Sequence, residues 1–131
     1  MRVLYIDDNR INLKVIEAML GIRSAQALSA PNGEVGLAML DAEDVDAVLV
    51  DLRMPDMDGF EVLRRIRGRG DAKASLPVCI VTADPDSNLG AQARRAGADE
   101  FLTKPVMMAD LFAFLDAVEA QDPRPAVRAC P

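Results

Sequence analysis

Histidine and tryptophan are both absent from this chain of 131 residues, and aromatic residues make up only 4% of it. Without histidine, the chain has no His-containing zinc site, no histidine general base and no Ser-His-Asp triad. With so few aromatic rings, the hydrophobic core must consist mainly of Val, Leu, Ile, Ala and Met side chains. The remaining candidates for chemistry are carboxylates, lysines and hydroxyl groups.

Cysteines and long apolar runs are also scarce. Cys79 lies in an apolar stretch and Cys130 lies near the C-terminus, a pattern that fits neither a disulfide framework nor a metal motif. No apolar run is long enough to span a membrane, and the first residues do not form a signal peptide, so we expect a cytoplasmic protein with no membrane contact. The net charge of −6 argues against direct binding of nucleic acid.

What the chain does contain is a regular alternation of short apolar runs and amphipathic segments. Half of its residues are hydrophobic, which is typical of one globular domain at this length. Five strand–helix alternations predict an α/β fold, in which a doubly wound parallel sheet is covered by helices on both faces. The predicted strands are 3–6, 25–30, 47–50, 77–81 and 99–103, and the predicted helices are 10–20, 33–40, 58–66, 84–97 and 107–119.

Several element boundaries have local signals. Gly21 is expected to end the first helix, and Asp58 followed by Glu61 has the spacing of a capping box. Asp84-Pro85 indicates an N-cap followed by an N1 proline. Residues 121–131 contain three prolines and little that could pack, so we divide the chain into a folded domain, 1–120, and a flexible C-terminal tail, 121–131. The apolar stripe of the first helix comprises Ile11, Val15, Ile16, Met19 and Leu20.

Polar residues follow the apolar strands at the ends that should share one edge of the sheet. Asp7 and Asp8 end the first strand, Asp51 the third and Thr82 the fourth, and Lys104 comes just after the fifth. The carboxyl ends of parallel strands form the edge at which open α/β sheets bind ligands. Crowded carboxylates repel one another unless a cation or proton intervenes. A site for a hard divalent cation that handles phosphate is the simplest interpretation.

Each of these residues also has an ordinary structural interpretation. The Asp7-Asp8 pair is consistent with a helix N-cap beside a solvated neighbour, and Asn9 is a further candidate for that cap. Thr82 is consistent with a β-branched strand residue, and Lys104 with a surface lysine. Asp51 differs, because a carboxylate that follows an apolar strand needs a compensating partner. The shared position of all these residues at strand ends favours the functional interpretation.

Four stretches resemble the receiver domain of two-component response regulators. They are Ile6-Asp7-Asp8-Asn9, residues 50–59 (VDLRMPDMDG), Val81-Thr82-Ala83 and residues 101–105 (FLTKP). The resemblance covers residues 2 to about 120. It implies a (βα)5 fold with five parallel strands in the flavodoxin-like order 2-1-3-4-5.

The resemblance also implies roles for individual residues. Asp51 would be the phosphoacceptor, and Asp7, Asp8, Asp51 and the backbone carbonyl of Arg53 would hold Mg²⁺. Lys104 would pair with the carboxylate and then with the phosphoryl group, and a cis peptide bond would follow it. The switch residues would be Thr82, which hydrogen-bonds a phosphoryl oxygen, and Phe101, which turns inward.

The function implied is a phosphorylation-dependent switch in a two-component phosphorelay, not an enzyme beyond its own self-catalysed phosphorylation and dephosphorylation. The donor would be a phosphohistidine on a histidine kinase or a histidine phosphotransfer protein. Residues 86–120 would contact a downstream protein, and a homodimer through that face remains open. Opposite charges on Arg53 and Asp84 are expected to pair at the site mouth and to hinder attacking water.

Two alternatives remain at this stage. One is a protein-interaction module that keeps only the fold, against which the complete set of polar residues counts. The other is a Mg²⁺-dependent phosphatase with an aspartyl nucleophile. Haloacid-dehalogenase-like enzymes use a second Asp two residues after the nucleophile, where this chain has Arg53.

Overall fold

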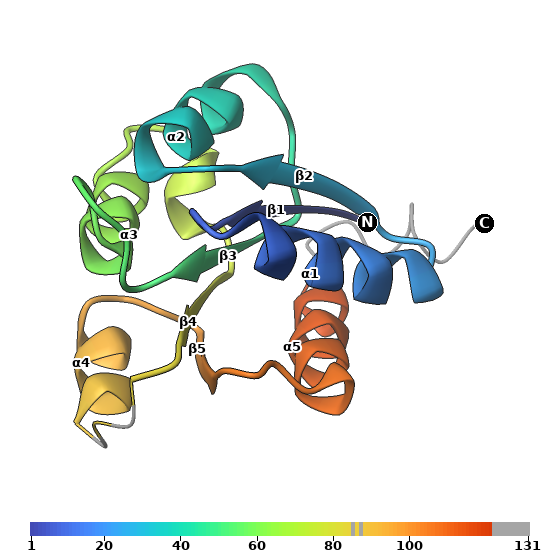
Figure 1. Cartoon of the computed structure of the whole chain (residues 1–131). Helices are drawn as coiled ribbons and strands as arrows, with labels where there is room; N and C mark the ends of the chain where they lie inside the picture. The colour runs from blue at the N-terminus through green and yellow to red at the C-terminus, as the bar shows by residue number, and fades with distance from the viewer. Residues whose placement is uncertain (85, 87, 122–131) are drawn as a thin grey trace.

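A five-stranded parallel sheet in the order β2-β1-β3-β4-β5 forms the centre of the molecule, as predicted (Figure 1). The computed structural model describes residues 1–84, 86 and 88–121. Among these residues, no helix is long and apolar enough to cross a membrane. The elements are β1 (Arg2–Ile6), α1 (Arg10–Ile22), β2 (Gln26–Ala30), α2 (Gly33–Ala42), β3 (Ala47–Asp51), α3 (Gly59–Arg67), the 3-10 helix η1 (Ala72–Ser75), β4 (Val78–Thr82), α4 (Leu89–Arg95), β5 (Glu100–Thr103) and α5 (Met108–Ala120).

Helices cover both faces of the sheet, and each face has its own hydrophobic cluster. On one face, α2, α3 and α4 pack against alternate strand residues such as Leu4 and Val50. On the other face, α1 and α5 pack against Tyr5 and Leu49. Because β3 and β4 are covered on both faces, every one of their residues is buried, which is why their sequences are almost continuously apolar.

The strand order places the site. β1 pairs with β2 on one side and with β3 on the other, and Ile6 lies level with Val50 in the β1–β3 register. The connections therefore diverge between β1 and β3, which makes the carboxyl ends of these two strands a topological switch point. Asp7 and Asp51, which follow Ile6 and Val50, meet at this point.

The first helix departs from prediction in two ways. It continues through Gly21 to Ile22, and the chain turns instead at Ser24, which has a φ of 59°. Of the predicted apolar stripe, Ile16 and Leu20 are buried, whereas Ile11 is 73% exposed and Val15 46%. The five residues span too wide an arc of the helix for all of them to face the sheet. Ile11 and Val15 therefore lie on the outer side of α1.

The fourth helix begins later than predicted. It starts at Leu89 instead of near Asp84, and its N-cap residue, Asn88, makes no side-chain capping bond. Asp84 fails to cap this helix because its carboxylate accepts hydrogen bonds from the Asp86 N–H and from Arg53. Pro85, the predicted N1 residue, lies outside the described residues. The helix is complete before Gly97, which has a φ of 107°.

The remaining predictions about the elements concern the start of α3 and the C-terminal end of the chain. Asp58 Oδ1 accepts a 2.9 Å hydrogen bond from the Glu61 N–H, which confirms Asp58 as the N-cap of α3. The Glu61 carboxylate accepts from Arg64 and Arg65, so the structure shows the N-cap half of the predicted capping box. The 3-10 helix η1 was not predicted. The proposed tail, 121–131, lies outside the described residues apart from Gln121.

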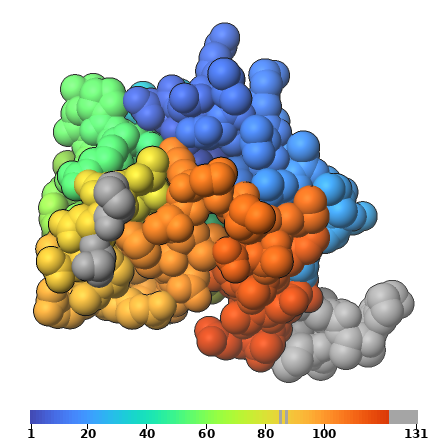
Figure 2. All heavy atoms as spheres, turned by 60° about the horizontal axis from the view of Figure 1, so that its bottom comes forward, coloured from blue at the N-terminus to red at the C-terminus, as the bar shows by residue number. Residues whose placement is uncertain are grey.

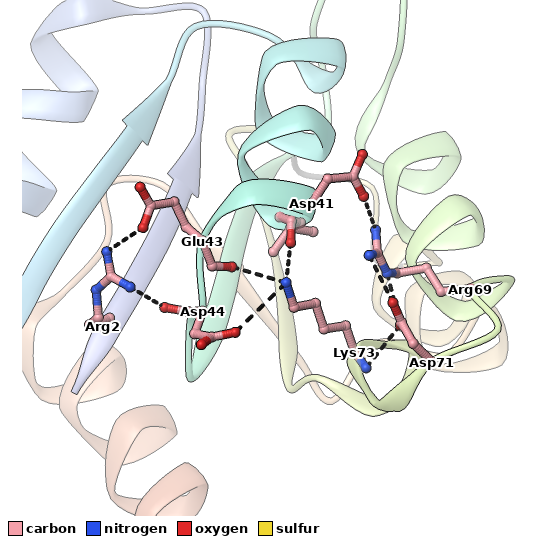
Figure 3. A network of polar contacts seen from close by, with 8 residues as sticks. Arg2, Asp41, Glu43, Asp44, Arg69, Asp71 and Lys73 are labelled. Carbon is pink, nitrogen blue, oxygen red and sulfur yellow. Dashed lines mark hydrogen bonds and ion pairs between the residues drawn. The ribbon is translucent and has the colours of Figure 1, made fainter.

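A network of charged side chains ties the elements together at the amino ends of the strands, opposite the candidate site (Figure 3). The ammonium of Lys73, in η1, donates to the carbonyls of Leu40 and Glu43 at the C-terminal end of α2. Arg69 pairs with Asp41 of α2 at 2.9 Å. These contacts satisfy carbonyls that the end of a helix leaves free, and they hold the α2–β3 connection against the α3–β4 connection.

Candidate functional site

A pocket of about 400 Å³ lies at the carboxyl ends of β1, β3, β4 and β5. It is the region that the sequence predicted, since each strand contributes the residue at its end or in the loop that follows. The lining residues are Asp7, Asp8, Asn9, Asn12, Asp51, Arg53, Ala83, Asp84 and Lys104.

Three carboxylates converge in this pocket. Asp7 and Asp8 follow β1, Asp51 ends β3, and one oxygen from each lies within 4.8 Å of the others. Asp7 is fully buried and Asp51 is 5% exposed, whereas Asp8 is exposed to solvent. Carboxylates that converge beside solvent fit a hard cation such as Mg²⁺, which binds oxygen ligands and keeps several waters. The donor set therefore suits the predicted ion.

Asp7 is held by three donors although it lies in the protein interior. Its Oδ2 accepts hydrogen bonds from the Tyr5 hydroxyl at 2.5 Å and from Lys104 Nζ at 3.0 Å, and its Oδ1 accepts one from the Asn9 N–H at 2.9 Å. Burial alone would raise the pKa of Asp7, but these hydrogen bonds outweigh it and lower the pKa. Asp7 is therefore ionised at neutral pH.

Asp51 has a different environment from Asp7. Burial raises its pKa most, the nearby charge of Asp7 raises it further, and Lys104 only partly offsets both, so the pKa of Asp51 is about 6. Lys104 Nζ lies 3.1 Å from Asp51 Oδ1. Burial lowers the pKa of Lys104, but its hydrogen bonds to Asp7 and Asp51 outweigh that effect and raise it. The pocket thus holds two buried carboxylates of unlike acidity around one ammonium group.

The loop after β5 places Lys104. The backbone N–H of Lys104 donates to the carbonyl of Thr82 at 2.8 Å, and the Lys104-Pro105 peptide bond is cis, as predicted. With its backbone anchored to the end of β4, Lys104 extends its side chain across the pocket to β1 and β3. Its side chain is only 18% exposed.

The two predicted switch residues, Thr82 and Phe101, lie in β4 and β5. Thr82 is fully buried at the end of β4, and its Oγ1 accepts a hydrogen bond from the Asp84 N–H at 3.1 Å. Phe101, in β5, is half-buried, and its ring lies against Gly90 of α4. Neither is among the described residues that line the pocket. The structure therefore brings Asp7, Asp8, Asp51 and Lys104 together. Thr82 ends β4 just before the loop that borders the pocket, whereas Phe101 lies level with Ile80 and packs against α4.

The predicted pairing across the site mouth is confirmed. Arg53, in the loop after β3, donates to Asp84 Oδ2, in the loop after β4, at 2.7 Å. The Arg53 side chain is 63% exposed and that of Asp84 is 28% exposed. The hydrogen bond from the Asp86 N–H lowers the pKa of Asp84 most, and the hydrogen bond and positive charge of Arg53 lower it further.

Close backbone packing positions Asp51. Gly59, the first residue of α3, donates its N–H to the carbonyl of Leu52 at 3.0 Å. A Cβ atom at Gly59 would lie 2.8 Å from the carbonyl oxygen of Asp51 and 3.0 Å from the Cα of Leu52. Only glycine allows this approach without a shift of the backbone. The return of the loop to β3 therefore depends on Gly59.

Tyr5 is a site residue that the sequence interpretation missed. Tyr5 lies two residues before Asp7, which directly follows β1, so both side chains point to the same side of the sheet. That spacing is the available signal. Burial raises the pKa of Tyr5 most, and the hydrogen bond to the Asp7 carboxylate raises it further. The Tyr5 hydroxyl therefore stays protonated and acts as a donor.

Comparison with known proteins finds similar sequences in three signalling and regulatory proteins. Protein PilH from Pseudomonas aeruginosa is 35% identical over 119 residues, which cover 91% of this chain and 98% of that protein. Hybrid signal transduction histidine kinase L from Dictyostelium discoideum is 35% identical over 116 residues, or 84% of this chain but 7% of that protein. The chain covers 50% of the cell cycle transcriptional regulator CtrA from Caulobacter vibrioides.

Solved structures and a family model agree with these relatives. A receiver domain protein from Clostridium thermocellum has a TM-score of 0.81 at 29% identity, covering 89% of this chain and 92% of that one. The receiver domain of a sensor histidine kinase from Pseudomonas aeruginosa, with a magnesium ion coordinated in its active-site cleft, has a TM-score of 0.79 at 28% identity, covering 88% and 94%. Because the family model matches residues 3–116, this chain belongs to the family of response regulator receiver domains.

Proposed function

We propose that this chain is a phosphorylation-dependent switch whose phosphoacceptor is Asp51. The observation that carries the proposal is the setting of Asp51: a buried carboxylate that borders a pocket, 3.1 Å from an ammonium group and beside two further carboxylates that suit a divalent cation. Receiver domains are phosphoacceptor signalling domains of two-component systems, and they receive phosphate from histidine kinases. The residue roles that follow are part of the proposal.

Asp51 acts as the nucleophile. Above a pH of about 6 its carboxylate is ionised, and one of its oxygens forms a bond to phosphorus while the phosphorus–nitrogen bond of the partner's phosphohistidine breaks. The imidazole leaves with its electron pair and takes a proton from solvent. The ammonium of Lys104 stabilises the negative charge that develops on the phosphoryl oxygens. No group of this chain other than Asp51 changes its covalent bonds.

Asp7, Asp8, Asp51 and the backbone carbonyl of Arg53 would hold Mg²⁺. When bound there, the ion neutralises charge that otherwise keeps an anionic phosphoryl group away from a carboxylate. Asp7 supplies a carboxylate that is already ionised and fixed by hydrogen bonds. The same residues give the chain its self-catalysed phosphorylation and dephosphorylation.

Thr82 and Phe101 change position when Asp51 is phosphorylated. Thr82 Oγ1 accepts a hydrogen bond from the Asp84 N–H, and in the phosphorylated state its hydroxyl would donate to a phosphoryl oxygen. Movement of Thr82 carries the β4–α4 loop with it and leaves room for Phe101, whose ring lies against Gly90. The phosphoryl group adds charge of about −1.5 to −2, which biases two loop arrangements through its contacts with Thr82 and Lys104.

The proposed output face is residues 86–120. Figure 2 brings the lower side of Figure 1 forward, and there the yellow-orange to orange segments of α4, β5 and α5 form one continuous surface. A downstream protein or a second copy of this chain would contact that face. The division into a domain over 1–120 and a tail, and location in the cytoplasm, also remain predictions from the sequence.

The test is incubation with Mg²⁺ and acetyl phosphate, followed by measurement of the intact mass. We expect one added phosphoryl group on the native chain and none on Asp51→Asn. No addition to the native chain with acetyl phosphate or with a phosphorylated histidine kinase would favour the interaction module that keeps only the fold. Sustained hydrolysis of a small phosphate ester would favour the phosphatase.

A further inference from the structure

Tyr5 is a buried polar residue directly beneath the acidic pocket. It is the single tyrosine of the chain and is 1% exposed. Its ring belongs to the hydrophobic cluster that α1 and α5 form with the sheet. Its hydroxyl lies 2.5 Å from Asp7 Oδ2, so the aromatic side chain spans the distance from an apolar core to a carboxylate of the pocket.

We propose that Tyr5 is a positioning residue of the metal site, whose hydroxyl fixes the rotation of the Asp7 carboxylate toward Asp8 and Asp51. The inference rests on the proposed function, because it takes these carboxylates as the groups that hold a divalent cation. Metal-ligating carboxylates are commonly oriented by hydrogen bonds from residues that do not touch the metal. Tyr5 has that position with respect to Asp7.

The other donors to Asp7 show why Tyr5 is needed. The Asn9 N–H holds Oδ1, and Lys104 shares Oδ2 with Tyr5. Lys104 is also 3.1 Å from Asp51, the residue that reacts, so its ammonium is drawn toward any phosphoryl group that arrives there. Of the side-chain donors to Asp7 among the described residues, Tyr5 is the one that is not shared with Asp51. It therefore keeps Oδ2 of Asp7 in place while Lys104 changes partner, and the Asn9 N–H keeps Oδ1.

The chemistry of the side chain agrees with this role. A buried hydroxyl is costly unless it has a hydrogen-bond partner, and an apolar residue would fill this part of the core without that cost. The neighbouring inward residue of the same strand face, Val3, is indeed apolar. The distinguishing property of Tyr5 is thus the donor that it directs at Asp7.

The test compares Mg²⁺ binding by the native chain, Tyr5→Phe and Val3→Ala, measured by isothermal titration calorimetry. Tyr5→Phe keeps the ring and removes only the hydroxyl, so we expect Mg²⁺ affinity to fall about tenfold. Val3→Ala perturbs the same core without touching Asp7 and should keep native affinity. Equal affinity in Tyr5→Phe, or an equal loss in Val3→Ala, would overturn the inference. Absence of Mg²⁺ binding by the native chain would instead contradict the metal site of the proposed function.

A second readout comes from the native chain itself. Because there is one tyrosine and no tryptophan, its near-ultraviolet absorption and fluorescence come mainly from Tyr5. Titration with Mg²⁺ should change this signal with the midpoint found by calorimetry, since the ion would bind the carboxylate to which the hydroxyl donates. A signal that stays constant while calorimetry records binding would count against the role of Tyr5.

Discussion

The ammonium of Lys104 lies 3.1 Å from the carboxylate of Asp51, although Asp51 ends β3 and Lys104 lies in the loop after β5. The same ammonium lies 3.0 Å from Asp7. One cation therefore faces two buried carboxylates, and the charge in this part of the pocket is incompletely balanced. This imbalance is the physical basis of the first two predictions, because a bound cation or a proton would relieve it.

Asp51→Asn should stabilise the metal-free protein at neutral pH. The folded state raises the pKa of Asp51 from 3.8 to about 6, so folding becomes less favourable as the pH rises through that window. Asparagine removes this penalty, and we expect a gain of about 1–3 kcal/mol in the free energy of unfolding above pH 6. Urea denaturation across the pH range measures it.

The pH dependence is the control for this variant. Only at about pH 2–3, well below the unfolded pKa of 3.8, is the Asp51 carboxyl protonated in both the folded and the unfolded native chain, so the gain from Asn should disappear there. Saturating Mg²⁺ at neutral pH should narrow the difference as well, since the native chain would gain more from the ion than the variant. A gain that is constant with pH would contradict the origin assigned to it.

Lys104→Met should destabilise the protein, most strongly at high pH. The variant keeps two buried carboxylates and removes the cation between them, so we expect a loss of about 2–4 kcal/mol near pH 8. The loss should be smaller at about pH 5, where Asp51 binds a proton and the repulsion falls. Chemical denaturation of the metal-free chain at both pH values tests the difference, and Lys14→Met, on the exposed side of α1, is a matched control.

The success of the sequence interpretation has a physical reason in β3 and β4. Both strands are buried on both faces, so their residues are apolar, and the polar residues Asp51 and Thr82 mark where each strand ends. In a parallel sheet those ends share one edge, which is why polar residues from distant parts of the sequence could be assigned to one pocket.

Other features depended on information that periodicity does not carry. The start of α4 was misplaced because Asp84 has two uses for its carboxylate besides capping, the Asp86 N–H and Arg53. The sequence predicts Ile11 on the apolar stripe, but it is 73% exposed, because a helical pattern does not indicate how the helix is rotated on the sheet. The hydrogen bond from Tyr5 to Asp7 depends on how far the tyrosine side chain extends, which hydrophobic periodicity does not indicate.

Separating Arg53 from Asp84 should shorten the lifetime of the phosphorylated state. The ion pair links the two loops that border the pocket and lies where water would approach Asp51. Exposed ion pairs of this kind are weak, so we expect loss of phosphate to be about 1.5- to fivefold faster. Loss of phosphoryl mass with time in Arg53→Ala and Asp84→Ala measures the effect.

A double variant distinguishes the pair from its separate members. If the pair acts as a unit, Arg53→Ala/Asp84→Ala should lose phosphate no faster than either single variant. Arg64→Ala removes a comparably exposed arginine that pairs with Glu61, away from the lining of the pocket, and should keep the native lifetime. Unchanged half-lives in both single variants would rule out a role of the pair in excluding water.

Gly59→Ala should destabilise the protein, whereas Gly21→Ala should stabilise it. An added Cβ at Gly59 would meet the Asp51 carbonyl oxygen at 2.8 Å, and we expect a loss of about 1–3 kcal/mol because backbone atoms must move. At Gly21, the second-last residue of α1, a Cβ would meet nothing within 4 Å, and replacing glycine by alanine stabilises a helix by up to about 0.5–1 kcal/mol. Thermal denaturation of both variants tests whether the two changes in stability have opposite signs. A loss at Gly21 would show that α1 ends there, as the sequence predicted, and a neutral effect at Gly59 would show that the loop before α3 does not need its close approach to Asp51.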